Sequence, residues 1–192
     1  MRLFFAIDLD APARAAAERV GILLAGRAAG LGASIRWVRP AKLHLTLAFL
    51  GDVPDPSTIL RALAAAPFAQ PPFRLSLSVA GVFPSSGAPR VVWMGPGRGG
   101  EQAAVVARLL WRRLEDRGYG PGPPRFEPHV TLGRVRRLRT HGGRRLRAAL
   151  AETALPPISW TVDRVSLYQS RLESEGSTYQ RLATAALEGG AA

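Results

Sequence analysis

Two segments far apart in the chain share one alternating pattern that contains a histidine and a threonine. The first is Leu43–Leu50, which reads L-H-L-T-L-A-F-L, and the second is Phe126–Val135, which contains P-H-V-T-L-G-R. Alternate residues of a β-strand point to the same face of a sheet. Each segment is therefore predicted to be a strand with its histidine and threonine on one face, while Leu45, Leu47 and Phe49 turn into a core.

The remaining sequence predicts helices and further strands around these two segments. Alternating and β-rich runs indicate strands, whereas Asp, Pro and Gly mark helix ends. Strands are predicted at Arg2–Leu9, Ile35–Val38, Leu43–Leu50, Phe73–Phe83, Arg90–Met94, Phe126–Val135, Ile158–Ser170 and Thr178–Leu187, and helices at Ala11–Gly30, Asp55–Ala66, Glu101–Arg117 and Thr140–Glu152. No linker is long or polar enough to mark a domain boundary, so we expect two related lobes, each a sheet backed by helices.

The chain is strongly basic. Its 192 residues include 26 lysines and arginines against 14 acidic residues, a formal net charge of +12, and Lys42 is the only lysine. Arginine presents a planar fork that suits phosphate oxygens, so the excess favours an acidic partner such as RNA. The densest basic stretch, residues 134–147, is predicted to follow an RNA backbone or to form a solvated face.

Two absences narrow the class of protein. The chain contains no cysteine, which excludes disulfide frameworks, thiol nucleophiles and cysteine-ligated metal sites. No apolar run approaches the roughly 18 residues that a membrane span requires. The apolar stretch Leu3–Ile7 is also shorter than the core of a signal peptide. We therefore expect a cytoplasmic protein without a membrane partner.

His44 and His129 are the candidate catalytic residues, with Thr46 and Thr131 beside them. An imidazole titrates near neutral pH, so one ring can accept a proton while the other donates one. Such a pair can drive the attack of water on a phosphodiester, and threonine hydroxyls can hydrogen-bond the non-bridging oxygens. Two histidines on separate strands lack the further ligands of a metal site, so no metal is expected. The third histidine, His141, lies in the loop-like run R-T-H-G-G and is assigned no role.

Several stretches of the sequence resemble one family. They read R-L-F-F-A-I-D-L, I-R-W-V-R-P-A-K-L-H-L-T-L-A-F-L-G, G-V-F-P-S-S-G-A-P-R-V-V-W-M-G, F-E-P-H-V-T-L-G-R and V-D-R-V-S-L-Y-Q-S-R-L. In these the chain is similar to the bacterial and archaeal RNA 2′,3′-cyclic phosphodiesterases, also called 2′-5′ RNA ligases, of the 2H phosphoesterase superfamily. The resemblance implies an α+β fold with two pseudo-symmetric lobes, each a mainly antiparallel sheet backed by helices. A central cleft would divide this single domain, residues 1–192.

The same resemblance implies a reaction and a role for each motif residue. The enzyme would open the 2′,3′-cyclic phosphate at an RNA 3′ end to leave a 2′-phosphomonoester, with reversible 2′-5′ ligation as a related activity. His44 would donate a proton, His129 would accept one, and Thr46 and Thr131 would hold the phosphate. The expected enzyme is a monomer without a cofactor, and its partners are RNAs with cyclic phosphate ends, tRNA fragments among them.

Arg134 follows the second motif on the same strand. Strict alternation turns it away from His129, unless a bulge at Gly133 brings it into the cleft. There the resemblance implies contact with the substrate phosphate, whereas on the other face it would form a structural salt bridge.

Four aromatic residues are further candidates for substrate binding. Phe5, Trp37 and Phe49 are candidates for stacking on a terminal base, although aromatic residues in strands often belong to the core. Tyr168 either lines the cleft or is buried with one hydrogen bond.

Two other functions also fit these residues. The chain could be a non-catalytic RNA-binding module in which the histidines only contact phosphate. It could also be an enzyme with the same histidine pair that acts on a small cyclic nucleotide, such as a cyclic phosphate of ADP-ribose.

Overall fold

The computed structural model describes residues 1–64, 66–139, 142–156, 158–173 and 176–189. Strands, helices and one 3₁₀ turn (η1) alternate along these ranges. The elements are β1 (Arg2–Asp8), α1 (Ala11–Gly30), β2 (Ser34–Trp37), η1 (Pro40–Lys42), β3 (His44–Asp52), α2 (Ser57–Ala64), β4 (Phe68–Ala69), β5 (Phe73–Phe83), β6 (Val91–Pro96), α3 (Gly100–Glu115), β7 (Val130–Arg137), α4 (Gly142–Ala151), β8 (Ile158–Val162), β9 (Arg164–Glu173) and β10 (Gly176–Glu188). His141 and the predicted start of the fourth helix at Thr140 lie outside the described residues.

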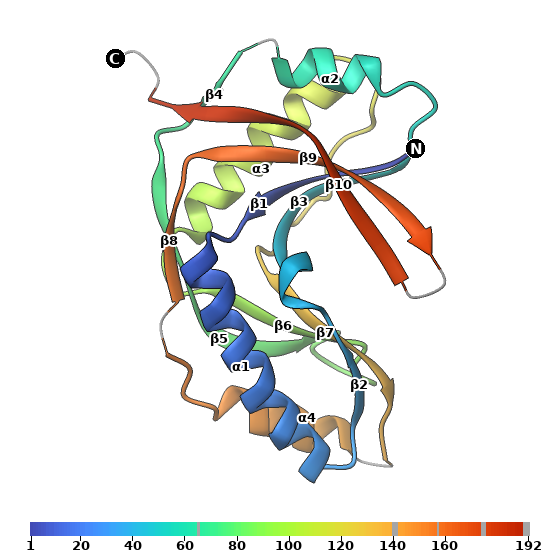
Figure 1. Cartoon of the computed structure of the whole chain (residues 1–192), viewed down its shortest axis with the longest axis vertical. Coiled ribbons are helices and arrows are strands. Elements are labelled where there is room, and N and C mark those ends of the chain that lie inside the picture. The colour runs from blue at the N-terminus through green and yellow to red at the C-terminus, as the bar shows by residue number, and fades with distance from the viewer. Residues whose placement is uncertain (65, 140–141, 157, 174–175, 190–192) are drawn as a thin grey trace.

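The described strands form one sheet in the order β4-β10-β9-β1-β3-β7-β6-β5-β8, and β2 also pairs with β7. Their pairings are antiparallel except that of β10 with β4. We call β1, β3, β4, β9 and β10 with helices α2 and α3 the first lobe, and β2 and β5 to β8 with helices α1 and α4 the second lobe. Figure 1 shows the first lobe above the second. This arrangement confirms the predicted α+β class with mainly antiparallel, helix-backed lobes.

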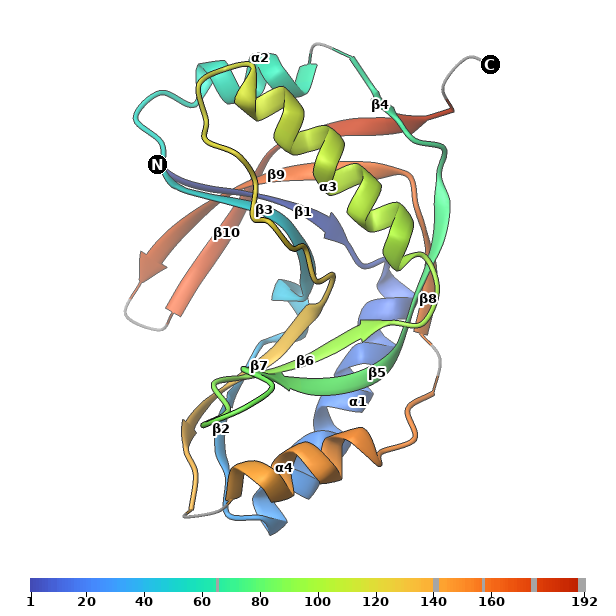
Figure 2. The ribbon, with the colours of Figure 1, turned by 180° about the vertical axis from the view of Figure 1, so that it is seen from behind.

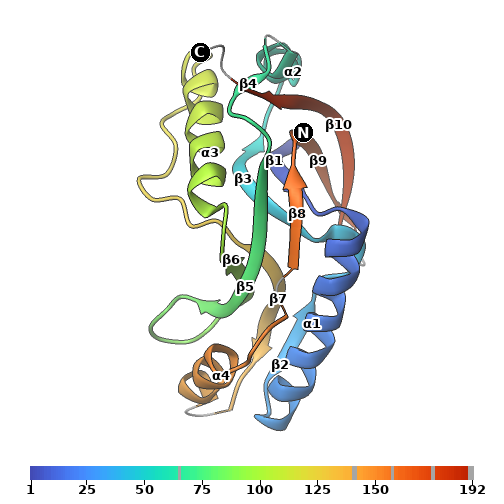
Figure 3. The same ribbon diagram turned by 90° about the vertical axis from the view of Figure 1, so that its left-hand side faces the viewer.

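Each lobe combines segments from both ends of the chain. β9 and β10, near the C-terminus, pair beside β1 in the first lobe, whereas α1, near the N-terminus, packs on β2 and β8 in the second. Figure 2 shows α3 across the back of the first lobe, and Figure 3 shows α1 and α4 together at the opposite end of the molecule. The lobes are therefore not the two halves of the sequence.

The prediction of one strand at Ile158–Ser170 was wrong. The chain forms β8, which pairs with β5, and then β9, which pairs with β1. The change of partner occurs at Asp163, whose carboxylate accepts two hydrogen bonds from the guanidinium of Arg164. The residues on both sides favour β-structure, so the pattern predicts extended chain but does not indicate that the chain changes lobes.

Helix α1 forms where the sequence predicts it, because its first turn is capped. The Asp10 carboxylate accepts a hydrogen bond of 2.8 Å from the backbone N–H of Ala13. Pro12 occupies the first turn, where a backbone N–H has no partner within the helix, so its lack of an N–H removes no helix hydrogen bond. Five buried residues then form one stripe along the helix at steps of three and four residues. No helix in the described part of the chain is both long and apolar enough to cross a membrane.

We expect Asp10→Ala to lower the free energy of unfolding by about 1 kcal/mol, because the N–H of Ala13 loses its acceptor at the start of a 20-residue helix. Urea unfolding followed by circular dichroism measures this change. Asp10→Asn, which keeps a side-chain acceptor, is the matched control and should lose much less. An unchanged midpoint for Asp10→Ala would contradict the cap.

Candidate active site

Among the described residues, the strands of the two lobes pair at one position, Leu45 of β3 with Val130 of β7. Both side chains are fully buried, so they point into the core. The histidine and threonine of each motif lie on either side of this pair, so they face away from the core, on one common side of the sheet. The register sets each histidine across from the threonine of the other strand. These cross-strand neighbours are His44 with Thr131 and Thr46 with His129.

The strands separate on both sides of this junction. Pro128, two residues before β7, has no backbone N–H to donate to a neighbouring strand, and η1 ends two residues before β3 begins. Beyond the junction β7 pairs with β2 and β6, whereas β3 pairs with β1. The four motif residues therefore lie where the two lobes diverge.

A cavity of about 430 Å³ occupies this place, and we call it the junction cleft. Three of the four motif residues contribute to its wall, whereas His129 does not line it, and three cationic side chains and three aromatic rings complete the wall. These lining residues are His44, Thr46, Thr131, Arg2, Lys42, Arg134, Phe4, Phe49 and Tyr179. A concave wall of apolar surface with a few polar groups is typical of a site for a small ligand, and its cationic side chains suit an anionic group such as phosphate.

Both histidines make the same hydrogen bond. Nδ1 of His44 lies 2.8 Å from the carbonyl oxygen of Lys42, and Nδ1 of His129 lies 2.8 Å from the carbonyl oxygen of Glu127. A carbonyl oxygen only accepts, so Nδ1 of each ring carries a proton and donates it. This bond fixes the tautomer, and Nε2 is the atom that remains for proton exchange in each ring.

Aromatic rings enclose His44 on two sides. The ring of Phe4 lies 4.9 Å from the imidazole, and Tyr179 makes an edge contact at 5.4 Å. Burial lowers the pKa of His44 below its ordinary value of 6.5, because a charged ring loses its hydration there. The charge of His129 also lowers this pKa, whereas the hydrogen bond to Lys42 and the charge of Asp8 raise it.

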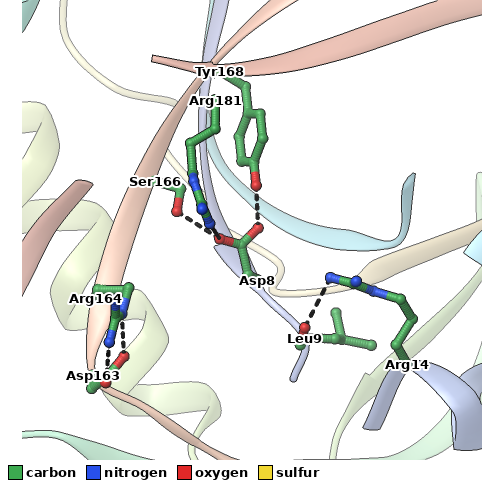
Figure 4. Close-up of polar contacts among 8 residues, drawn as sticks. All are labelled: Asp8, Leu9, Arg14, Asp163, Arg164, Ser166, Tyr168 and Arg181. Atoms are coloured by element: carbon green, nitrogen blue, oxygen red, sulfur yellow. Dashed lines mark hydrogen bonds and ion pairs between the residues drawn. The ribbon is translucent and has the colours of Figure 1, made fainter. Parts of the chain in front are cut away.

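Asp8 pairs with His44 in the register of β1 and β3. Its carboxylate accepts hydrogen bonds from Tyr168 at 2.7 Å and Ser166 at 2.6 Å, and Arg181 lies 3.8 Å away, as Figure 4 shows. Burial and the bond to Asp8 raise the pKa of Tyr168 to about 12. Tyr168 thus has the second of its two predicted placements, a partly buried ring with one hydrogen bond, and it stacks on Phe4 at 5.3 Å.

β3 carries a β-bulge directly after its motif. Thr46 and Ala48 pair with adjacent residues of β1, so Leu47 is the extra residue. A bulge shifts the alternation by one position, and Phe49 turns toward the junction cleft, where it is 52% exposed. The prediction that Phe49 turns into the core was wrong for this reason.

β7 carries the corresponding bulge. Thr131 and Gly133 pair with adjacent residues of β6, so Leu132 is the extra residue. The shift turns Arg134 into the junction cleft, as expected if a bulge is present. The two motif strands therefore repeat each other in backbone conformation, with Phe49 in one lobe at the position of Arg134 in the other.

Phe5 was wrongly predicted as a stacking residue, because its side chain is fully buried. β1 is apolar on both faces, so its composition does not show which phenylalanine faces the cleft. Phe4 lies on the same face as Asp8 and lines the junction cleft, whereas Phe5 lies on the opposite face. Trp37 does not line this cleft but a second, adjoining cavity.

Most of the basic stretch that the sequence predicts to follow RNA divides between two cavities, and Arg137 lines neither of them. Arg134 and Arg136 line the adjoining cavity. Four later arginines line a separate cavity of about 600 Å³ beside α4, and they are Arg139, Arg144, Arg145 and Arg147. Only the first part of the stretch therefore lies next to the histidines.

Comparison with known proteins now adds to this geometry. The profile of the 2′-5′ RNA ligase superfamily matches residues 27–173. The chain belongs to the 2′-5′ RNA ligase superfamily. It is 36% identical to the RNA 2′,3′-cyclic phosphodiesterase of Archaeoglobus fulgidus over 71% of this chain and 74% of that protein. It is 31% identical to the RNA 2′,3′-cyclic phosphodiesterase of Thermotoga maritima over 99% of this chain and 97% of that protein.

A solved structure has the same fold. The crystal structure of Escherichia coli LigT complexed with 3′-AMP aligns with a TM-score of 0.67 at 30% identity and covers 97% of both chains. The relatives confirm the predicted resemblance, and they confirm that this superfamily member is an enzyme of the phosphodiesterase class.

The junction cleft of this protein is also lined by residues that the sequence did not predict. Phe4 and Lys42 line it, and so do Tyr179 and Leu172 of the β9–β10 pair. The polar residue Asp8 at the end of β1 indicates which face of the strand is turned toward the cleft, and Phe4 lies on that same face. No motif marks Tyr179. Among the described residues, no three His, Asp or Glu side chains gather as a metal would require.

We predict that His44 titrates below 6.5 in the free protein and that Asp8→Asn lowers its pKa further, because the variant removes a negative charge that favours the imidazolium. NMR titration of the imidazole signals measures both values. Asp116→Asn, at the end of α3, is a control of equal charge change that should leave His44 unaffected. A His44 pKa at or above 6.5, or no shift in Asp8→Asn, would contradict this description of the site.

Proposed function

We propose that this protein hydrolyses the 2′,3′-cyclic phosphate at the 3′ end of RNA to a 2′-phosphomonoester. The observation that carries the proposal is the pair of imidazoles on one face of the β3–β7 junction, each with Nδ1 bonded to a carbonyl. The RNA 2′,3′-cyclic phosphodiesterases to which the chain is similar support the choice of substrate. LigT, which has been solved with 3′-AMP, supports nucleotide binding in this fold.

The proposed reaction needs one base and one acid. Nε2 of His129 accepts a proton from a water molecule as its oxygen attacks phosphorus. The bond between phosphorus and the 3′ oxygen breaks, and that oxygen takes the proton from Nε2 of His44. The product carries a 2′-phosphate and a free 3′-hydroxyl, and proton exchange with solvent restores both rings. The direction of transfer follows the family resemblance, because the two motifs are alike in sequence.

The substrate itself supports His44 as the acid. Burial lowers the pKa of His44 in the free protein, but a phosphate anion beside the ring favours the imidazolium, as the Asp8 carboxylate already does. The hydroxyls of Thr46 and Thr131 are proposed to donate to the non-bridging oxygens, where charge builds in the transition state. Arg134 on the same wall adds a guanidinium fork that fits phosphate oxygens.

The terminal base is proposed to stack on Phe49. Its ring lines the cleft and is half exposed, and the guanidinium of Arg2 lies 5.5 Å from its centre. A stacked base in such a place contributes about 1–3 kcal/mol to binding without choosing among bases. When the 5′-hydroxyl of another RNA takes the place of water, the same acid and base would form a 2′-5′ phosphodiester, which is the proposed ligation activity.

We expect His44→Ala and His129→Ala each to reduce kcat/KM for an RNA with a 2′,3′-cyclic phosphate end by about 10²- to 10⁴-fold, since each removes one proton-transfer group. The double variant should be little worse than either single variant, because acid and base act in one step. The wild type should keep its activity in EDTA, since the two imidazoles activate the water and protonate the leaving oxygen without a metal ion.

Circular dichroism and thermal unfolding serve as controls that the variants fold. Salt-sensitive RNA binding by the wild type without ring opening would favour the non-catalytic RNA-binding module. Full activity of the double variant would refute the two-histidine mechanism.

A further inference from the structure

A second cavity of about 450 Å³ adjoins the junction cleft, and we call it the basic groove. It lies between β2 and β7 on one side and the β9–β10 pair on the other. The two cavities have several wall residues in common, among them Lys42, Arg134 and Tyr179. A ligand that leaves the junction cleft past Arg134 therefore enters the basic groove.

The groove is strongly positive. Among the residues that the structure describes, its wall holds five cationic side chains and one acidic side chain, Glu173, whose carboxylate accepts a hydrogen bond of 2.7 Å from Thr178. The cationic residues are Arg36, Arg39, Lys42, Arg134 and Arg136. Such a concentration of one sign of charge in a concavity attracts polyanions and suits phosphodiesters.

Two of these arginines are spaced along one strand. After the bulge at Leu132, Arg134 and Arg136 are alternate residues of β7 and lie on the same face, about 6.6 Å apart along the strand. Arg134 lines both cavities, whereas Arg136 lines only the basic groove. This spacing is comparable with that of successive phosphates in an extended nucleic acid strand.

The groove also offers apolar surface. Trp37 lies half-buried in its wall, and Leu172 of β9 is 67% exposed. Flat or apolar side chains beside cations are the usual platform for a base of a single strand. Lys42 connects the two walls of the groove, because its Nζ donates a hydrogen bond of 2.6 Å to the carbonyl oxygen of Ser177 in β10.

The chemistry of the substrate gives the direction of the chain. A 2′,3′-cyclic phosphate can only be the 3′ end of an RNA, so the rest of the molecule leaves the junction cleft on its 5′ side. We propose that the basic groove binds the 5′-phosphodiester of the terminal nucleotide and the nucleoside before it. The enzyme then selects RNA chains over free cyclic nucleotides. This inference depends on the proposed function of the junction cleft.

The test compares substrates of increasing length. kcat/KM is measured for a nucleoside 2′,3′-cyclic phosphate, the same compound with a 5′-phosphate, and the di- and trinucleotides with the same cyclic end. We expect a clear rise when the 5′-phosphate is added and a further rise for the dinucleotide. Arg136→Ala should reduce the ratio of trinucleotide to mononucleotide kcat/KM by about tenfold, the scale of one charge-assisted contact. It should also reduce the slope of the logarithm of that ratio against the logarithm of salt concentration by about 1, the amount that one lost phosphate contact removes.

Arg137→Ala is the matched control. Arg137 is exposed, follows Arg136 on β7 and lines neither cavity, so the ratio should not change. Equal kcat/KM along the substrate series would overturn the groove proposal, and so would equal effects of Arg136→Ala and Arg137→Ala. In both cases ring opening would persist. Failure of the proposed function gives a different result from failure of the groove proposal, because the cyclic phosphate of no substrate in the series would then be opened.

Discussion

In the part of the chain that the structure describes, one antiparallel pair, Leu45 with Val130, joins the strands of the two lobes. The side chains of this pair are fully buried, and their burial sets which way the neighbouring residues face. A slip of either strand by one residue would exchange the faces of that strand and move its histidine into the core. The arrangement of the histidines and threonines thus follows from apolar packing behind them rather than from contacts among themselves.

The two motif strands have matching backbones but different surroundings. Each has a bulge after its threonine and a histidine whose Nδ1 donates to a carbonyl two residues earlier. His44, however, lies between Phe4 and Tyr179 and beside Asp8, whereas the ring of His129 makes an edge contact with Phe83 at 4.9 Å. The same backbone therefore supplies two imidazoles with unequal environments, which is what distinct acid and base roles require.

Much of this was predictable from sequence, because burial and period-two alternation are local properties. They predicted both motif strands and two lobes in which a sheet is backed by helices, and the family resemblance supplied the α+β class. The errors came from events that add or redirect one residue. The bulge at Leu47 turned the side chain of Phe49 to the opposite face of the sheet. The chain changes lobes at Asp163, where the spacing between successive buried apolar residues increases from two positions to three, between Val162 and Val165. Partners supplied by distant strands, such as Tyr179, carry no local signal.

The proposed mechanism requires that Nε2 of His44 and Nε2 of His129 reach one phosphorus atom from opposite sides. A crystal structure with a nucleoside 2′,3′-cyclic vanadate, whose five-coordinate vanadium imitates the transition state, measures this directly. We expect both Nε2 atoms within about 2.6–3.2 Å of the two oxygens at opposite ends of the vanadium. Threonine hydroxyls should contact the equatorial oxygens. A vanadate held by only one imidazole, or bound away from the β3–β7 junction, would contradict it.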